Sequence, residues 1–185
     1  KTSRDLGASI SDYVSATADW ARLGYGLPDA EELARVSTLF SNVGDGIENV
    51  ADASSYMISI LKGFDLAADD AQKVADLINE VANNEPASAS DISEILTRSG
   101  AALHEAGNDL SQAISLGVAM NSVTQNAEST GQTLKTVSMY LRAAKTDLEN
   151  MGESSDGCAN SVSELRSELK QLTGVDIMKD AAGTQ

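Results

Sequence analysis

The sequence predicts an all-α protein of about eight amphipathic helices, arranged as two related three-helix units joined by a linker helix. Apolar side chains recur at every third or fourth position in one segment after another, as they do on one face of a helix. Hydrophobic residues make up 42% of the 185-residue chain, and alanine and leucine supply most of them, whereas aromatic residues make up only 4%. This composition favours helices over sheets.

Two helices are expected before residue 46. The first ends near Gly24, and the second begins at Pro28, because a first helical turn does not need the N–H that proline lacks. Acidic residues follow Pro28 and suit the positive end of the helix dipole, and Gly44-Asp45-Gly46 ends the helix. The predicted inner faces are Ile10, Tyr13, Val14 and Thr17 in the first helix, then Leu33, Val36, Phe40 and Val43 in the second.

Two further helices complete the first half of the chain. The third helix carries apolar residues at spacings of three and four, and the fourth is a linker helix from about Ala67 to Ala82. Asn83-Asn84 and Pro86 end the linker helix. The predicted inner faces are Val50, Ala53, Met57, Ile60 and Phe64 in the third helix, then Ala71, Val74, Leu77, Ile78 and Val81 in the fourth.

The pattern then restarts. Asp91 with Glu94 resembles a capping box at the start of a fifth helix, and Asp109 with Gln112 resembles one at the start of a sixth. Ala106-Gly107 separates these two helices. The predicted inner faces are Ile92, Ile95, Leu96, Ser99 and Leu103 in the fifth helix, Ala113, Leu116, Met120 and Val123 in the sixth, and Leu134, Val137, Leu141, Ala144 and Leu148 in the seventh.

The last part of the chain differs in composition from the rest. Met151 to Asn160 is rich in glycine, serine and acids and predicts a loop. An eighth helix with coiled-coil-like spacing follows and ends at Gly174. Its apolar positions, and those of a short stub after it, are Val162, Leu165, Leu169 and Leu172, then Val175, Ile177 and Met178. Because the chain starts at Lys1 and ends with no evident stop, we expect a fragment of a longer protein.

The two halves match in the order of their motifs, which suggests an internal duplication; chance agreement between amphipathic helices is the alternative. The first match has an offset of 82 and pairs Ile10, Tyr13, Val14 and Thr17 with Ile92, Ile95, Leu96 and Ser99. The second has an offset of 83 and pairs Gly24, Leu27, Ala30, Leu33 and Phe40 with Gly107, Leu110, Ala113, Leu116 and Val123. The third has an offset of 80 and pairs Met57, Ile60 and Leu61 with Val137, Tyr140 and Leu141. We expect a first unit over 1–66, a linker helix over 67–86, a second unit over 87–150, and a loop, helix and stub over 151–185.

Charge and composition narrow the class of partner. The formal net charge is −15, from 28 acids and 13 bases, so we expect no nucleic-acid binding and no attraction to an anionic membrane surface. No stretch approaches the ~20 apolar residues that a membrane span needs. Cys158 is the single cysteine, so an intrachain disulfide is impossible.

No residue pattern indicates catalysis, a metal site or a cofactor. A pairing of Cys158 with the single histidine, His104, would need the fold to bring them together. Asp65, Asp69 and Asp70 cluster near a helix start, where we interpret them as capping residues. The glycine turns join helices, without the Lys-Ser or Lys-Thr of a phosphate-binding loop. Glu31-Glu32 point about 100° apart on a helix and do not converge as an acid–base pair.

The order of several short motifs resembles the core domain of phage tail tape measure proteins, of phages or prophages of Gram-positive bacteria. The motifs are Ala87-Ser88-Ala89-Ser90-Asp91-Ile92, Arg98-Ser99-Gly100, Glu105-Ala106-Gly107, Leu134-Lys135-Thr136-Val137-Ser138-Met139-Tyr140-Leu141-Arg142, Gly152-Glu153, Asp156-Gly157 and Leu172-Thr173-Gly174-Val175-Asp176-Ile177-Met178; Trp20-Ala21-Arg22 resembles the upstream region. Tyr140 stands where the family commonly has arginine, which puts in doubt any ion pair made there.

The resemblance implies a structural, non-enzymatic module involved in tail assembly and tail length determination. It places the protein in the lumen of the virion tail tube, and in the host cytoplasm during assembly. The implied partners are tail proteins, namely the tube protein, tail assembly chaperones and tip or baseplate components, with possible self-association. Two rivals remain: a helical adaptor or signalling domain, which a gene neighbourhood without tail genes would favour, and a helical lytic enzyme module, which cleavage of peptidoglycan would favour.

Overall fold

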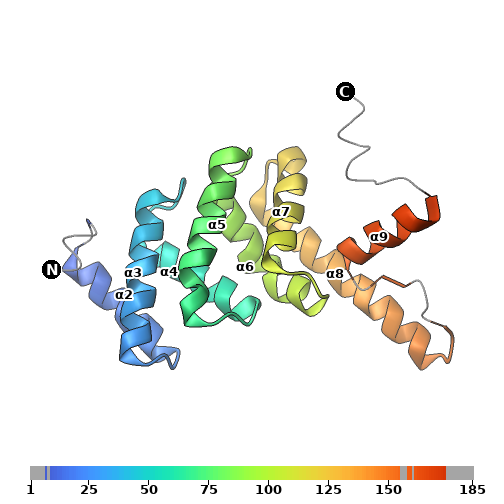
Figure 1. The fold of residues 1–185 in the computed structure, drawn as a ribbon, viewed down its shortest axis with the longest axis horizontal. Helices are drawn as coiled ribbons and strands as arrows, with labels where there is room; N and C mark the ends of the chain where they lie inside the picture. The colour runs from blue at the N-terminus through green and yellow to red at the C-terminus, as the bar shows by residue number, and fades with distance from the viewer. Residues whose placement is uncertain (1–6, 8, 155–157, 160, 174–185) are drawn as a thin grey trace.

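The computed structural model describes residues 7, 9–154, 158, 159 and 161–173, and within this part of the chain the fold is all-α, with no strand (Figure 1). The elements are α2 (Ile10–Arg22), α3 (Leu27–Val43), α4 (Val50–Gly63), the short 3₁₀ helix η1 (Ala68–Asp70), α5 (Ala71–Asn84), α6 (Ala89–Glu105), α7 (Leu110–Thr124), α8 (Ala127–Asn150) and α9 (Val162–Thr173). The predicted fold class is therefore confirmed.

The helices follow one another along the long axis of the molecule, with α2 near one end and α8 and α9 at the other (Figure 1). Helix α2 packs against α3 and α4, and α8 packs against α6 and α7. Helix α6 lies between these groups and contacts α4, α5, α7 and α8. One hydrophobic cluster runs from Ala16 in α2 to Val118 in α7 and so includes residues of both predicted units. The proposed boundary at residues 67–86 stays a prediction.

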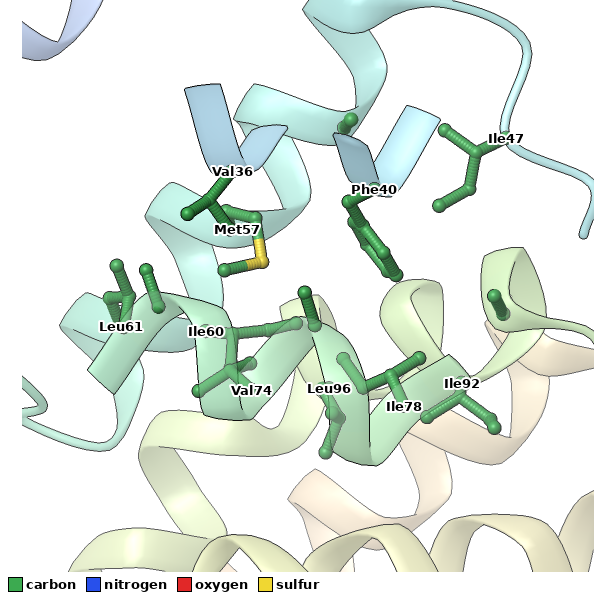
Figure 2. Close-up of a cluster of buried hydrophobic side chains, with 14 of the residues drawn as sticks. Val36, Phe40, Ile47, Met57, Ile60, Leu61, Val74, Ile78, Ile92 and Leu96 are labelled. Atoms are coloured by element: carbon green, nitrogen blue, oxygen red, sulfur yellow. The ribbon is translucent and has the colours of Figure 1, made fainter. Parts of the chain in front are cut away.

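The centre of the core joins α3, α4, α5 and α6. Phe40 of α3, Ile60 of α4, Ile78 of α5 and Leu96 of α6 are all buried and lie close together (Figure 2). The linker helix α5 thus contributes to the core rather than only joining two units. The predicted inner faces of α4 and α6 are buried at every position.

Glycines let neighbouring helices approach α6 closely. A Cβ atom on Gly117 of α7 would lie 2.9 Å from the Cγ2 atom of Ile95, and one on Gly131 of α8 would lie 2.9 Å from the Cβ atom of Arg98. On the opposite side, a Cβ atom on Gly63 of α4 would lie 3.2 Å from the backbone nitrogen of Ala101. Because a Cβ atom would approach its neighbours this closely, the packing around α6 favours glycine at these crossing points.

For some helices, the residues that face the core are not the ones that the sequence predicts. In α2, Ile10 and Val14 are exposed, and the buried residues are Ala16 and Trp20. No described helix covers the outer side of α2, so its inner face is set by contacts with α3 and α4 alone. At the end of α3, Val43 is exposed beyond the core.

Helix α7 also faces the core with a different side from the predicted one. Val123 is exposed, and Leu116 and Met120 are only half-buried. Apolar residues lie on several sides of this helix, so their spacing does not select one face. The close approach to Ile95 requires Gly117 to face inward, and the buried residues are Ala113, Ile114, Gly117, Val118 and Asn121.

Towards the C-terminus, the structure tests the predictions only in part. In α8, Leu134 is buried and Leu141 and Leu148 are half-buried, but Val137 and Ala144 are exposed. The second half of α8 extends past the bundle (Figure 1). Helix α9 is present, and Leu165 is half-buried on it. The side chains at three other predicted α9 positions, and the stub after Gly174, lie outside the described residues: Val162, Leu169 and Leu172, then Val175, Ile177 and Met178.

One of the two predicted capping boxes is placed three residues too late. The backbone N–H of Asp91 donates to Oγ of Ser88 at 3.0 Å, and the backbone N–H of Ser88 donates to Oδ2 of Asp91 at 3.2 Å. Asp91 is therefore the third helical residue and not the cap, and Glu94 instead binds Arg98. The box formed by Asp109 and Gln112 is confirmed.

The Ser88 cap provides a local stability test. Replacing Ser88 with alanine removes the hydroxyl that accepts the Asp91 N–H, and we expect it to lower the free energy of unfolding by about 1 kcal/mol. Ser90→Ala is the matched control, because Ser90 is the second residue of the same helix and its side chain makes no capping bond. Urea unfolding followed by circular dichroism measures both. Equal losses in the two variants would contradict the observed cap.

Candidate interaction surfaces

The two residues that could have formed a nucleophile and base lie in different parts of the chain. His104 lies exposed at the end of α6, where its ring packs edge-on against Phe64 with the ring centroids 5.8 Å apart. Cys158 is half-buried in the segment between α8 and α9 and forms no disulfide. In the part of the chain that the structure describes, no group of three or more His, Cys, Asp or Glu side chains could hold a metal ion.

Apart from the pKa of Tyr13, which burial raises, the shifted pKa values fall on ion pairs at the helix surface. A side-chain hydrogen bond from Arg35, at 2.6 Å, holds the pKa of Glu32 below its usual value. In the same way Lys73 donates to Asp70 at 2.9 Å and lowers the pKa of that carboxyl. Asp70 precedes α5 but forms no side-chain capping bond, so the capping interpretation of its carboxylate is wrong. These carboxylates stabilise helix turns and do not converge on a cavity.

An apolar groove of about 460 Å³ lies between α5 and α7. Leu77 and Val81 line it from α5, and Ile114 and Val118 line it from α7, with serines of α7 along one side. The groove explains why Leu77 and Val81, which the sequence predicts to be buried, are only half-buried. Sequence reasoning missed this surface, because periodicity marks an apolar face but not what covers it.

A second hollow, of about 400 Å³, lies between Arg98 of α6 and the first turns of α8. Arg98 is paired with Glu94 at 2.6 Å and with Glu128 at 3.1 Å. Since two carboxylates neutralise its guanidinium, the hollow is not an anion site. Arg98 therefore links α6 to the start of α8.

The two ends of the molecule expose apolar side chains. On α2 these are Ile10 and Val14, and on α8 they are Val137, Met139 and Tyr140. The absence of arginine at Tyr140 leaves the neighbouring ion pair intact, because Arg142 of α8 pairs with Glu105 of α6. None of the helices that the structure describes has the length and apolar character needed to cross a membrane.

In the part of the chain that the structure describes, the protein is a bundle of helices with an apolar groove, exposed apolar ends and surface ion pairs. Comparison with known proteins gives the particular family: the family of phage-related minor tail proteins matches residues 1–185, and the chain belongs to it. The chain is thus a structural component of a phage tail.

A curated relative gives a finer comparison. Over 78 residues the chain is 38% identical to a probable tape measure protein of Halomonas phage phiHAP-1. The matched segment is 42% of this chain and 9% of that relative, so the chain corresponds to a small part of the relative's length. No solved structure matches. The expectation of a phage of Gram-positive bacteria stays a prediction.

Proposed function

We propose that this chain is a folded assembly module of a tail tape measure protein, and not the straight spacer that sets tail length in proportion to its own. The observation that carries the proposal is the packing of successive helices against α6, in a chain that belongs to a tail protein family and resembles a tape measure protein. Its helices reverse direction at short turns, whereas a spacer needs one continuous extended element.

Length arithmetic separates the two roles. As one straight helix, the 185 residues would span roughly 280 Å at about 1.5 Å per residue. Folded as a compact domain, a chain of this size has a radius of gyration of about 16 Å. A ruler needs the first geometry, whereas the helices of this chain fold back on one another at short turns. The chain contributes to tail length by supporting correct assembly, and its own span is not the measured distance.

The proposed setting is the lumen of the tail tube in the virion, and the host cytoplasm during assembly. Its proposed partners there are the tube protein, tail assembly chaperones and tip or baseplate components. The apolar groove between α5 and α7 and the exposed ends of α2 and α8 provide surfaces for such contacts. We assign no enzymatic activity to the chain. The carboxylates whose pKa values are lowered, those of Glu32 and Asp70, lie in surface ion pairs.

An in-frame deletion of Ala8 to Leu148 from the phage gene tests the proposal. We expect few assembled tails, because the module is missing, and tails of normal length among those that form. Electron microscopy of lysates measures both quantities. The control replaces the deleted residues with the same number of residues of an unrelated straight coiled coil, and we expect this variant to remain defective. Tails shortened by roughly 210 Å, at about 1.5 Å per deleted residue, would show that the segment is a spacer.

A further inference from the structure

The apolar groove between α5 and α7 follows α7 along most of its length. On α7 its lining extends from Ser111 to Ser122, which is roughly 16 Å of helix at about 1.5 Å per residue. Leu77 and Val81, one turn apart on α5, form part of the opposite wall and are only half-buried. The groove is therefore an elongated surface about three helical turns long.

The polar side chains along the groove offer few directed hydrogen bonds. Oγ of Ser115 donates to the carbonyl oxygen of Ser111 at 2.9 Å, and Oγ of Ser122 donates to the carbonyl oxygen of Ala119 at 2.8 Å. Helix α7 carries no charged residue from its first position to its last. Because a polar small molecule needs several convergent polar groups, the groove favours apolar side chains instead.

An amphipathic helix fits this groove better than an extended segment does. An extended segment needs a strand edge to pair with its backbone N–H and C=O groups, and the walls of the groove are helices, which bond their own backbone groups. A docked helix likewise pairs its backbone groups internally and presents apolar side chains on one face. Ser115 and Ala119 are small and exposed, so the backbone of such a helix can approach α7 closely.

One end of the groove is negatively charged. Glu85 lines the groove, and Glu80 is exposed on α5 one residue before Val81. In the part of the chain that the structure describes, neither carboxylate belongs to an ion pair, and no basic residue lines the groove. The last turn of α5 also lacks a basic residue, so no basic side chain offsets the negative end of the helix dipole there.

We propose that the groove binds an amphipathic helix of a partner protein, which places apolar side chains between α5 and α7 and a lysine or arginine beside Glu80 and Glu85. The inference rests on the proposed function for the source of this helix, which is another tail protein. Recognition itself depends on the groove alone. Apolar contact supplies the affinity, and the acidic end fixes the direction of the bound helix and disfavours acidic helices.

Fluorescence anisotropy with two labelled synthetic peptides tests the inference on the 185-residue chain. Each peptide is a helix of about 18 residues, or about five turns, with leucine at every third or fourth position. The first peptide carries lysine beside the leucine stripe, and the second carries glutamate at the same positions. We expect the lysine peptide to bind about tenfold more tightly than the glutamate peptide, with a smaller difference at high salt.

Filling the groove should prevent binding. Ala119→Trp places a large side chain in the groove from α7, and we expect it to weaken binding of the lysine peptide by about tenfold or more. Val123→Trp is the matched control, since Val123 is 84% exposed on the same helix and does not line the groove. Circular dichroism checks that both variants are folded, and Ser115→Trp replaces Ala119→Trp if that variant is not.

Charge reversal tests the acidic end separately. Glu80→Lys together with Glu85→Lys should reverse the preference, so that the glutamate peptide binds more tightly than the lysine peptide. The control pair is Glu48→Lys together with Glu153→Lys, which makes the same change in net charge at exposed positions that do not line the groove. This pair should keep the preference for the lysine peptide.

Four results would overturn the inference. Neither peptide binds at concentrations up to about 1 mM; both bind equally well; Ala119→Trp binds as the wild type does; or the chain alone self-associates and Ala119→Trp abolishes this, which means that a second copy fills the groove. None of these results depends on tails, so the deletion of Ala8 to Leu148 tests the proposed function separately.

Discussion

Replacing Gly131 with leucine should lower the free energy of unfolding by about 3 kcal/mol, because the new side chain has no space at the crossing of α6 and α8. A Cβ atom at this position would lie 2.9 Å from the Cβ atom of Arg98 and 3.0 Å from the carbonyl oxygen of Ile95. The carbonyl belongs to the backbone of α6, so it cannot move aside as a flexible side chain could. The two helices must separate, and the buried contacts between them are lost.

Thr136→Leu is the control for this substitution. It places the same side chain on the exposed surface of α8, so we expect a change within about 0.5 kcal/mol. Urea unfolding at equilibrium measures the free energy of unfolding of both variants. The dependence of this free energy on urea concentration is checked for two-state behaviour. Equal stability of Gly131→Leu and Thr136→Leu would mean that α6 and α8 do not cross at Gly131.

Truncation of Leu96 to alanine is the second large effect. Leu96 is 1% exposed and lies in the cluster that joins α4, α5 and α6 (Figure 2). Loss of a buried leucine side chain leaves a cavity and costs 2–5 kcal/mol in well-packed cores, and we expect about 3 kcal/mol here. Val123→Ala removes apolar atoms from an exposed position of α7 and should change stability by less than about 0.5 kcal/mol. A loss below about 1 kcal/mol for Leu96→Ala would contradict the packing at the centre of the core.

The fold class and most helix limits could be predicted from sequence because they depend on local patterns. The spacing of Met57 and Ile60, and of Ile92 and Leu96, identifies faces that are buried in the structure. Where apolar residues surround the helix, as on α7, spacing alone selected the wrong face, and the contact of Gly117 with Ile95 decided it. Asp91 fitted a capping box in either of two positions, and Ser88 decided between them.

The interaction surfaces could not be predicted in the same way. Whether an apolar residue is buried depends on which elements lie beside it, and Val14 of α2 and Leu96 of α6 illustrate this. One is exposed and the other buried, because α6 has helices on both sides and α2 has them on one. The groove between α5 and α7 likewise results from the arrangement of the helices, and no sequence motif marks it.

We propose that this segment acts in the tail as a folded bundle. The most direct test introduces Gly131→Leu together with Leu96→Ala into the phage gene and counts and measures tails by electron microscopy, with Thr136→Leu together with Val123→Ala as the control. We predict that the first pair sharply reduces the number of tails without shortening those that form, and that the control pair assembles normally. Normal numbers of tails from a chain whose core has been disrupted would contradict the claim.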